Sequence, residues 1–158
     1  MVIKKVGQCE NETNLNFMFN YVKTATYNND QFIANYSYTI HNTFGKNQDV
    51  KLVVSARQCP EMENPDSCSY LLKDAEFKDV CDALGMDNQI WTEFAKSADI
   101  LKCPLKPRTL TRENFVFSND ILDLVPELTP SLWLIDFKIL DDNVLSACAV
   151  LEIVVSTI

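Results

Sequence analysis

The fold is decided by an alternating stretch of ten residues, Gln31-Phe32-Ile33-Ala34-Asn35-Tyr36-Ser37-Tyr38-Thr39-Ile40. Apolar or aromatic side chains occupy every second position, and the positions between them are mostly polar. This two-residue period is typical of a β-strand with one face buried and the other in water. We therefore expect a half-buried strand whose buried face carries Phe32, Ala34, Tyr36, Tyr38 and Ile40.

The same period recurs before and after this stretch. Residues 16–23 and 50–57 alternate in this way, and so does the segment around residue 135. Asp141-Asp142-Asn143 reads as a turn into a last strand over residues 144–156. Many half-buried strands in one chain favour antiparallel sheets. We expect an all-β fold, a two-layer antiparallel β-sandwich or cup, with one face formed by Phe17, Phe19, Tyr21, Val50, Leu52, Val54, Ala56, Trp133, Ile135, Phe137 and Ile139.

The middle of the chain has a different pattern. Residues 79–84 and 88–101 are expected to be helical, the second with Ile90, Trp91, Phe94, Ala98 and Leu101 at helix-like spacing. No internal repeat, low-complexity tract or linker interrupts the sequence, and 158 residues suit one domain. We therefore treat residues 1–158 as a single domain.

Composition excludes several classes of function. The 14 Lys+Arg and 22 Asp+Glu give a net charge of −8, which repels phosphate backbones, so we expect no nucleic-acid partner. Three glycines and one histidine cannot build a glycine-rich phosphate loop, a nucleophile elbow or a multi-histidine metal site. No C-x-x-C pair supports zinc, and the acidic residues lack the glycine-bearing loop of a calcium site. We expect no metal and no cofactor.

Catalysis has little support in the residues. Ser-His-Asp chemistry could use only His41, and no recognisable nucleophile turn accompanies it. A glycosidase needs two carboxyl groups facing each other across a cleft, and nothing in the spacing of the acids forces that arrangement. We interpret the acidic residues concerned as solvated loop carboxylates. We therefore expect that the protein is not an enzyme. The carboxylates that could have served in catalysis are Asp120, Asp123, Glu127, Asp141 and Asp142.

The cysteines indicate an oxidising compartment. Their even number and wide spacing favour three disulfides, although fifteen pairings are open from sequence alone. N-glycosylation sequons at Asn11 and Asn35 agree with a secreted or lysosomal glycoprotein. The amino end, Met1 to Lys5, has no apolar signal core, so we interpret the chain as processed. No stretch of about twenty apolar residues predicts a membrane span.

Several motifs carry a resemblance to a known family. They are Cys81-Asp82-Ala83-Leu84-Gly85-Met86, Cys103-Pro104-Leu105-Lys106, Asn114-Phe115-Val116-Phe117, residues 124–133 and the strand around Cys148. With the order of the six cysteines, they resemble the ganglioside activator family, within the ML-like lipid-recognition folds. Divergent secreted arthropod relatives, some associated with chemosensation, are more similar still. The resemblance implies the disulfides Cys9–Cys148, Cys59–Cys68 and Cys81–Cys103.

The resemblance also implies a cup with an apolar cavity that takes up a lipid. Trp91 and Phe94 are expected at its mouth, and Trp133 is either a rim anchor or a core residue. The alternative is that all these side chains pack a closed core. The expected wall residues are Phe19, Tyr21, Tyr36, Tyr38, Leu52, Val54, Phe115, Phe117, Ile135, Phe137 and Ile153.

The sequence thus leads to two functional hypotheses. The first is a carrier that binds a lipid or another long apolar ligand for transport or presentation, with transient membrane contact and a receptor or hydrolase as further partners. In the loop over residues 42–48, Phe44 is the one side chain suited to membrane insertion. His41 is either a pH sensor for release or a solvated loop residue. The second hypothesis is a disulfide-bonded β-sandwich interaction module without a ligand cavity.

Overall fold

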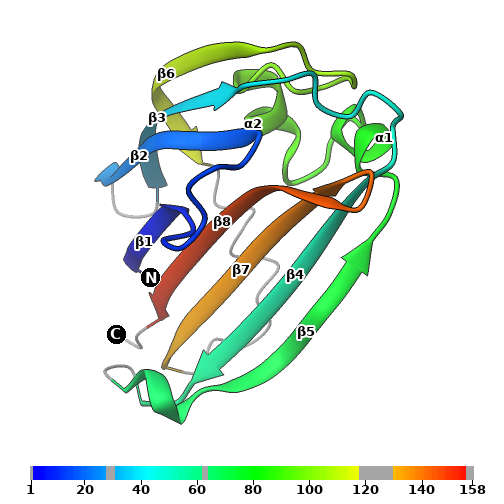
Figure 1. The fold of residues 1–158 in the computed structure, drawn as a ribbon. Helices are drawn as coiled ribbons and strands as arrows, with labels where there is room; N and C mark the ends of the chain where they lie inside the picture. Colours follow the sequence, from blue (N-terminus) through cyan, green and yellow to red (C-terminus); the bar gives the residue numbers. More distant parts are fainter. Residues whose placement is uncertain (1, 28–30, 62–63, 118–129, 156–158) are drawn as a thin grey trace.

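Two antiparallel β-sheets and a short helical segment form the structure (Figure 1), a computed structural model that describes residues 2–27, 31–61, 64–117 and 130–155. The larger sheet has the strand order β1-β8-β7-β4-β5, and the smaller has the order β2-β3-β6. The all-β, two-layer fold is therefore confirmed. The elements are β1 (Val2–Gln8), β2 (Phe17–Tyr27), β3 (Gln31–Ile40), β4 (Val50–Cys59), η1 (Pro65–Ser67), β5 (Ser69–Phe77), α1 (Val80–Leu84), α2 (Thr92–Ser97), β6 (Arg108–Phe117), β7 (Ser131–Asp141) and β8 (Val144–Val155).

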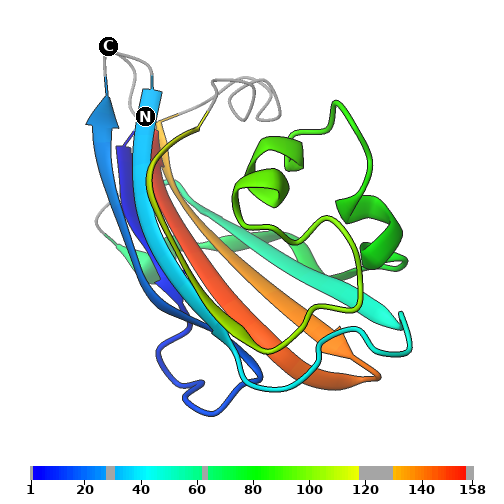
Figure 2. The same cartoon turned by 90° about the horizontal axis from the view of Figure 1, so that it is seen from above.

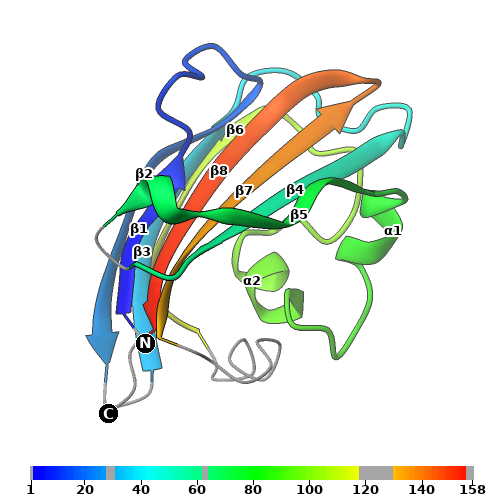
Figure 3. The same ribbon diagram turned by 90° about the horizontal axis from the view of Figure 1, so that it is seen from below.

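The two sheets approach each other at one side. There β1 contacts β2, and the Phe19 backbone N–H donates to Gln8 Oε1 across the 3.1 Å between them. The helices α1 and α2 lie on the other side of the molecule, away from β1 and β2 (Figures 2 and 3); α1 contacts β4 and α2 contacts β6. The sandwich is thus joined strand to strand along one side and bridged by the helical segment along the other.

Strand register confirms most of the expected alternation. Within the smaller sheet, Tyr38 of β3 is paired with Phe19 of β2 and Leu110 of β6. Within the larger sheet, Ile139 of β7 is paired with Leu52 of β4. Tyr38 and Ile139 pack in the same core cluster, so their rows face each other across the sandwich. We call the faces that carry these two rows the inner faces.

Tyr21 is a correction to the expected pattern. A register shift between Phe19 and Tyr21 reverses the alternation, so Tyr21 pairs with Ser37 and Val22 pairs with Tyr36. Tyr21 is 39% exposed, and its ring lies 5.5 Å from Lys23 Nζ. A β-bulge shifts every later side chain to the opposite face, and no periodicity count detects it. Tyr21 therefore lies on the outer face rather than with Phe17 and Phe19.

The helical segment is shorter than expected. Helix α1 matches residues 79–84 closely, but α2 covers only Thr92–Ser97 of the expected residues 88–101. Asn88 has a φ of 59° and Asp99 a φ of 55°, which stops a right-handed helix on both sides. Thr92 Oγ1 closes the turn before α2, because it accepts from the Gln89 N–H at 2.9 Å and donates to the Met86 carbonyl. The turn expected at residues 141–143 is confirmed, with positive φ at Asp142 and Asn143 as a two-residue hairpin requires.

The disulfides pair as the resemblance implied: Cys9–Cys148, Cys59–Cys68 and Cys81–Cys103. The first joins the loop after β1 to β8. The second closes the loop between β4 and β5, and the third joins α1 to the segment that leads into β6. The Cys81–Cys103 pair packs closely on Gly45, where an added Cβ would lie 3.0 Å from Cys103 Sγ. With a φ of 71°, Gly45 suits this tight turn.

The packed core lies between the smaller sheet and the helical segment. Its buried members include Tyr36, Tyr38 and Ile40 from β3 and both cysteines of the Cys81–Cys103 disulfide. Phe44 corrects a second expectation, because it is only 4% exposed and pairs with Leu105 through backbone hydrogen bonds of 2.8 Å in both directions. It belongs to the core and is not available for insertion into a membrane. The full buried cluster is Tyr36, Tyr38, Ile40, Phe44, Val50, Cys81, Ala98, Cys103 and Leu105.

The disulfides should differ in their contribution to stability. Cross-linking removes more entropy from the unfolded chain when the closed loop is longer, and the sequence separations are 139, 22 and 9 residues. Paired Cys→Ser replacement should lower the free energy of unfolding by about 5 kcal/mol for Cys9–Cys148, about 3.4 for Cys81–Cys103 and about 2.6 for Cys59–Cys68. Urea denaturation of the three double variants measures this order. Equal losses would contradict the unfolded-state explanation.

Candidate functional site

The inner face of the larger sheet is apolar but only half-buried. In the middle of the sheet, Val54 of β4, Phe137 of β7 and Ala149 of β8 lie side by side in register. All three are partly exposed, as are Leu52, Ile135 and Leu151 around them. In the middle of a fully packed sandwich such side chains lose nearly all contact with water. Half-burial there marks a stretch of apolar surface without complete packing.

The packed core reaches this surface only at one end. Val50 belongs to the core cluster and Ile139 packs against it; both lie near the β7–β8 turn. At the other end of the same rows, Ile153 and Ser131 are buried and Trp133 is half-buried. The half-buried stretch therefore runs along β7 between Trp133 and Phe137.

The smaller sheet contributes a line of aromatic rings. Tyr36 lies 5.5 Å from Phe94 of α2, Phe94 lies 6.0 Å from Phe115, and Phe115 lies 5.0 Å from Phe117, measured between ring centroids. The last two pairs are edge-to-face, an arrangement that stabilises aromatic pairs beyond their buried area. Phe115 and Phe117 are half-buried, and both share the inner face with Tyr38. The aromatic line therefore extends from the core to Phe117 at the end of β6.

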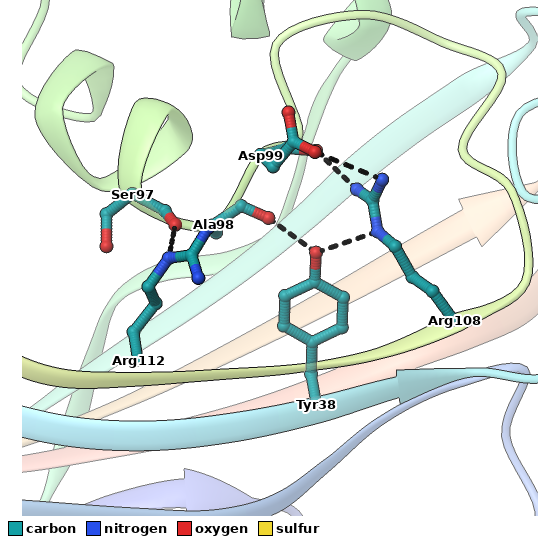
Figure 4. A network of polar contacts seen from close by, with 6 residues as sticks. All are labelled: Tyr38, Ser97, Ala98, Asp99, Arg108 and Arg112. Atoms are coloured by element: carbon teal, nitrogen blue, oxygen red, sulfur yellow. Dashed lines mark hydrogen bonds and ion pairs between the residues drawn. The ribbon is translucent and has the colours of Figure 1, made fainter.

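Polar contacts hold the end of α2 against the smaller sheet (Figure 4). The buried Tyr38 hydroxyl donates to the Ala98 carbonyl and accepts from Arg108 Nε at 3.2 Å. Arg108 also donates to the Asp99 carbonyl and pairs with its carboxylate at 3.4 Å. Arg112 Nε donates to the Ser97 carbonyl at 2.7 Å. Two cations thus satisfy carbonyls that a helix leaves free at its carboxyl end.

Burial affects the two tyrosines beneath this contact. It raises the pKa of Tyr38, although hydrogen bonding from Arg108 opposes part of the rise. Burial likewise raises the pKa of Tyr36, and the hydrogen bond of 2.6 Å between its hydroxyl and Ser97 Oγ lowers that pKa in part. Both hydroxyls therefore stay protonated and keep α2 attached to β3 at neutral pH.

The two tryptophans have different surroundings. Trp91 precedes α2, and its Nε1 donates to the Ala83 carbonyl of α1 at 2.7 Å. It therefore connects the two helices. Trp133 lies on the inner face of β7, between Gln58 of β4 and Ile153 of β8. Its Nε1 is buried and has no hydrogen-bond partner within the described part of the chain.

The structure brings most of the expected wall residues onto the two inner faces. Tyr21 is the exception described above, and Trp91 and Phe94 come from the helical segment. The expected glycosylation sites Asn11 and Asn35 are exposed; Asn35 Oδ1 accepts from the Asn114 N–H at 2.7 Å. The inner-face residues are Phe19, Tyr36, Tyr38, Leu52, Val54, Phe115, Phe117, Trp133, Ile135, Phe137 and Ile153.

A separate surface pocket of about 390 Å³ was not expected from the sequence. It lies where the start of β2, the end of β3 and the start of β8 meet. Its residues come from segments far apart in the chain and carry no shared motif, so only the folded structure brings them together. They are Thr13, Asn14, Leu15, Asn16, His41, Asn42, Val144, Leu145 and Ser146.

Within the described residues, no three His, Cys, Asp or Glu side chains gather in a way that could hold a metal ion. The catalytic candidates Asp120, Asp123 and Glu127 lie outside the described residues. Asp141 is described, and its Oδ2 accepts from the Gly45 N–H at 2.8 Å. None of the described helices is long and apolar enough to cross a membrane.

Comparisons with known proteins give a likeness in structure only. No family model matches the chain, and no curated protein matches its sequence. Eight chains of solved structures match, among them the crystal structure of chicken MD-1 complexed with lipid IVa. That match has 13% identity and a TM-score of 0.44, and it covers 97% of this chain and 88% of the other. Membership of the ganglioside activator family and an arthropod affinity stay predictions.

Tyr38→Phe tests the attachment of α2. The variant keeps the ring and removes one hydroxyl, so the Ala98 carbonyl loses this donor and Arg108 Nε loses this acceptor. We expect the free energy of unfolding to fall by about 1–3 kcal/mol. Tyr70→Phe is the matched control, because Tyr70 is 52% exposed; its loss should stay within about 0.5 kcal/mol. Equal losses in the two variants would show that the Tyr38 hydroxyl contributes nothing specific.

The raised pKa values also predict a pH dependence. A tyrosine whose pKa is raised by folding stabilises the native state fully below its unfolded pKa of about 10. That stability is lost as the pH rises through the higher folded pKa. We expect the wild-type free energy of unfolding to decline above about pH 10, and to decline less in Tyr38→Phe. Urea denaturation between neutral pH and this range measures the difference; parallel curves would contradict it.

Proposed function

We propose that this protein is a carrier that binds a lipid or another long apolar ligand between its two sheets. The half-buried apolar inner face of the larger sheet supports the proposal most strongly. Opposite it stands a smaller sheet whose own core is completed by the helical segment. Binding would need no catalytic group, because the ligand and the inner faces would replace contacts with water by contacts with each other.

The energy available for such binding is considerable. Each buried methylene contributes about 0.8 kcal/mol, so a dozen methylenes would give on the order of 10 kcal/mol before ordering costs are subtracted. The half-buried inner-face residues would provide the contacts, with Val54, Phe137 and Phe115 near their centre. The driving force is not directional, so this site would tolerate ligands of different shapes.

Entry is proposed at the side where the helices bridge the sheets. Trp91 and Phe94 lie on that segment, and β5 forms the edge of the larger sheet beside β4. Small displacements of α1 and α2 would widen this side, while β1 and β2 hold the other. The three disulfides support a secreted protein, since such bonds persist in oxidising compartments.

One observation favours the second hypothesis, an interaction module. Strand β5 exposes Tyr70, Leu71, Leu72 and Phe77, each between 45% and 53%. Exposed apolar side chains on an edge strand are typical of a surface that contacts another protein. The two hypotheses differ in whether the space between the sheets can accept additional atoms. A substitution that adds a large side chain to the inner face distinguishes them.

The test is to fill the proposed binding space from within. Ala149→Phe adds a ring beside Phe137 on the inner face, and Val150→Phe is its neighbour on the outer face. We expect Ala149→Phe to fold with little change in stability and to weaken binding of diphenylhexatriene at least tenfold, because its ring takes the ligand's place. Val150→Phe should bind the probe as the wild type does. Fluorescence titration gives the affinities, and mass spectrometry of extracts identifies ligands acquired during eukaryotic expression.

A closed core would give the opposite result. An added ring would then overpack the interior and cost about 1–3 kcal/mol of stability. That loss, together with failure of folded wild-type protein to bind the probe or to carry any extracted lipid, would refute the carrier and favour the interaction module.

A further inference from the structure

The Trp133 side chain presents an unused hydrogen-bond donor on the inner face. Its Nε1 is buried and has no partner among the described residues. The side chain shares a row with Ile135, Phe137 and Ile139, and Ile139 packs against the core cluster. The indole is therefore directed to the interior of the sandwich.

A buried donor without an acceptor is unusual in a native protein. The great majority of buried polar groups are hydrogen-bonded, and buried tryptophans usually find a partner for the N–H. Trp91 follows this rule, because its N–H has the Ala83 carbonyl. Asp141 Oδ1 is another buried polar atom that has no partner among the described residues, but it lies at the packed end, where Oδ2 of the same carboxylate accepts from the Gly45 N–H. Trp133 instead lies beside the half-buried stretch proposed for the ligand.

The neighbours of Trp133 restrict the chemistry of an acceptor. The inner-face residues in register with it, Gln58 and Ile153, are uncharged, and so is Ser131, which accepts from Gln58 Nε2 at 3.2 Å. A carboxylate placed here would lose its hydration without gaining a cation from these residues, and that loss is costly. A neutral carbonyl oxygen needs only one donor and fits a single indole N–H.

We propose that the ligand is a long-chain compound with a neutral carbonyl group, such as an ester, ketone, aldehyde or amide, and that Trp133 Nε1 donates to this oxygen. The proposal rests on the carrier function and adds the orientation of the ligand. The carbonyl lies at Trp133, and the chain follows the row of Ile135 and Phe137 toward Ile139. Four residues of β-strand separate Trp133 from Phe137 along the half-buried stretch, about 13 Å, which the part of the acyl chain next to the carbonyl would occupy.

The first experiment separates the carbonyl contact from apolar binding. Displacement of diphenylhexatriene is measured with methyl hexadecanoate, hexadecanoic acid and octadecane, for wild type, Trp133→Phe and Trp91→Phe. In Trp133→Phe, we expect about five- to tenfold weaker binding of the ester and no change for the alkane, as one lost hydrogen bond predicts. Trp91→Phe serves as the control, because its N–H already has a protein acceptor; the ester-to-alkane ratio should stay as in the wild type.

The possible results are distinguishable. Equal effects of Trp133→Phe on ester and alkane, or no effect on either, would overturn the carbonyl contact and leave the carrier standing. Tighter binding of the acid than of the ester in the wild type would overturn the neutral carbonyl. If none of the three compounds displaces the probe, or the wild type does not bind the probe, the carrier function itself fails and this proposal with it.

A second measurement does not depend on removing Trp133. The chain has two tryptophans, so Trp91→Phe leaves Trp133 as the sole indole fluorophore. Methyl hexadecanoate brominated next to the carbonyl should quench its emission more strongly than the ester brominated at the far end of the chain. Equal quenching, or stronger quenching from the far end, would overturn the proposed orientation.

Discussion

The helical segment between Cys81 and Cys103 is the packing partner of the smaller sheet. Because Ala98 and the disulfide cover Tyr36, Tyr38 and Ile40, the core of that sheet is largely complete without the larger one. The larger sheet joins this core only near Val50 and Ile139. Its remaining inner face is left half-buried, and the proposed function depends on this consequence.

Polar contacts keep that segment in place. Helix α2 is only six residues long, which is too short to be stable on its own. Its carboxyl end is held because Arg112 donates to the carbonyl of Ser97, the last helical residue, and because Tyr38 and Arg108 donate to the carbonyls of Ala98 and Asp99, which follow it. In a chain with a net charge of −8, these two cations have a local role at a helix end.

The sequence predicted the strands well because alternation is a local property. The rows on β3, β4 and β7 follow directly from it, and the ordered cysteines led through a family resemblance to the correct pairing. Tyr21 was misplaced because a bulge depends on pairing with β3, which the local pattern does not contain. Phe44 was misplaced for a related reason: its burial comes from Leu105, sixty-one residues later in the chain. The Trp133 N–H has no partner among the described residues, and this could be recognised only once its neighbours in the fold were known.

Stability and binding make opposite demands on the inner faces. Every apolar side chain that stays half-buried withholds part of the hydrophobic stabilisation that a closed sandwich would gain. A chain of this length can bury about two thirds of its unfolded surface, so disulfides are not needed merely to compensate for small size. They act mainly on the unfolded state, and they stabilise the fold without filling the space between the sheets. A carrier must stay folded before its ligand binds, while its interior is incompletely packed. The three disulfides would supply the stability that such an interior lacks.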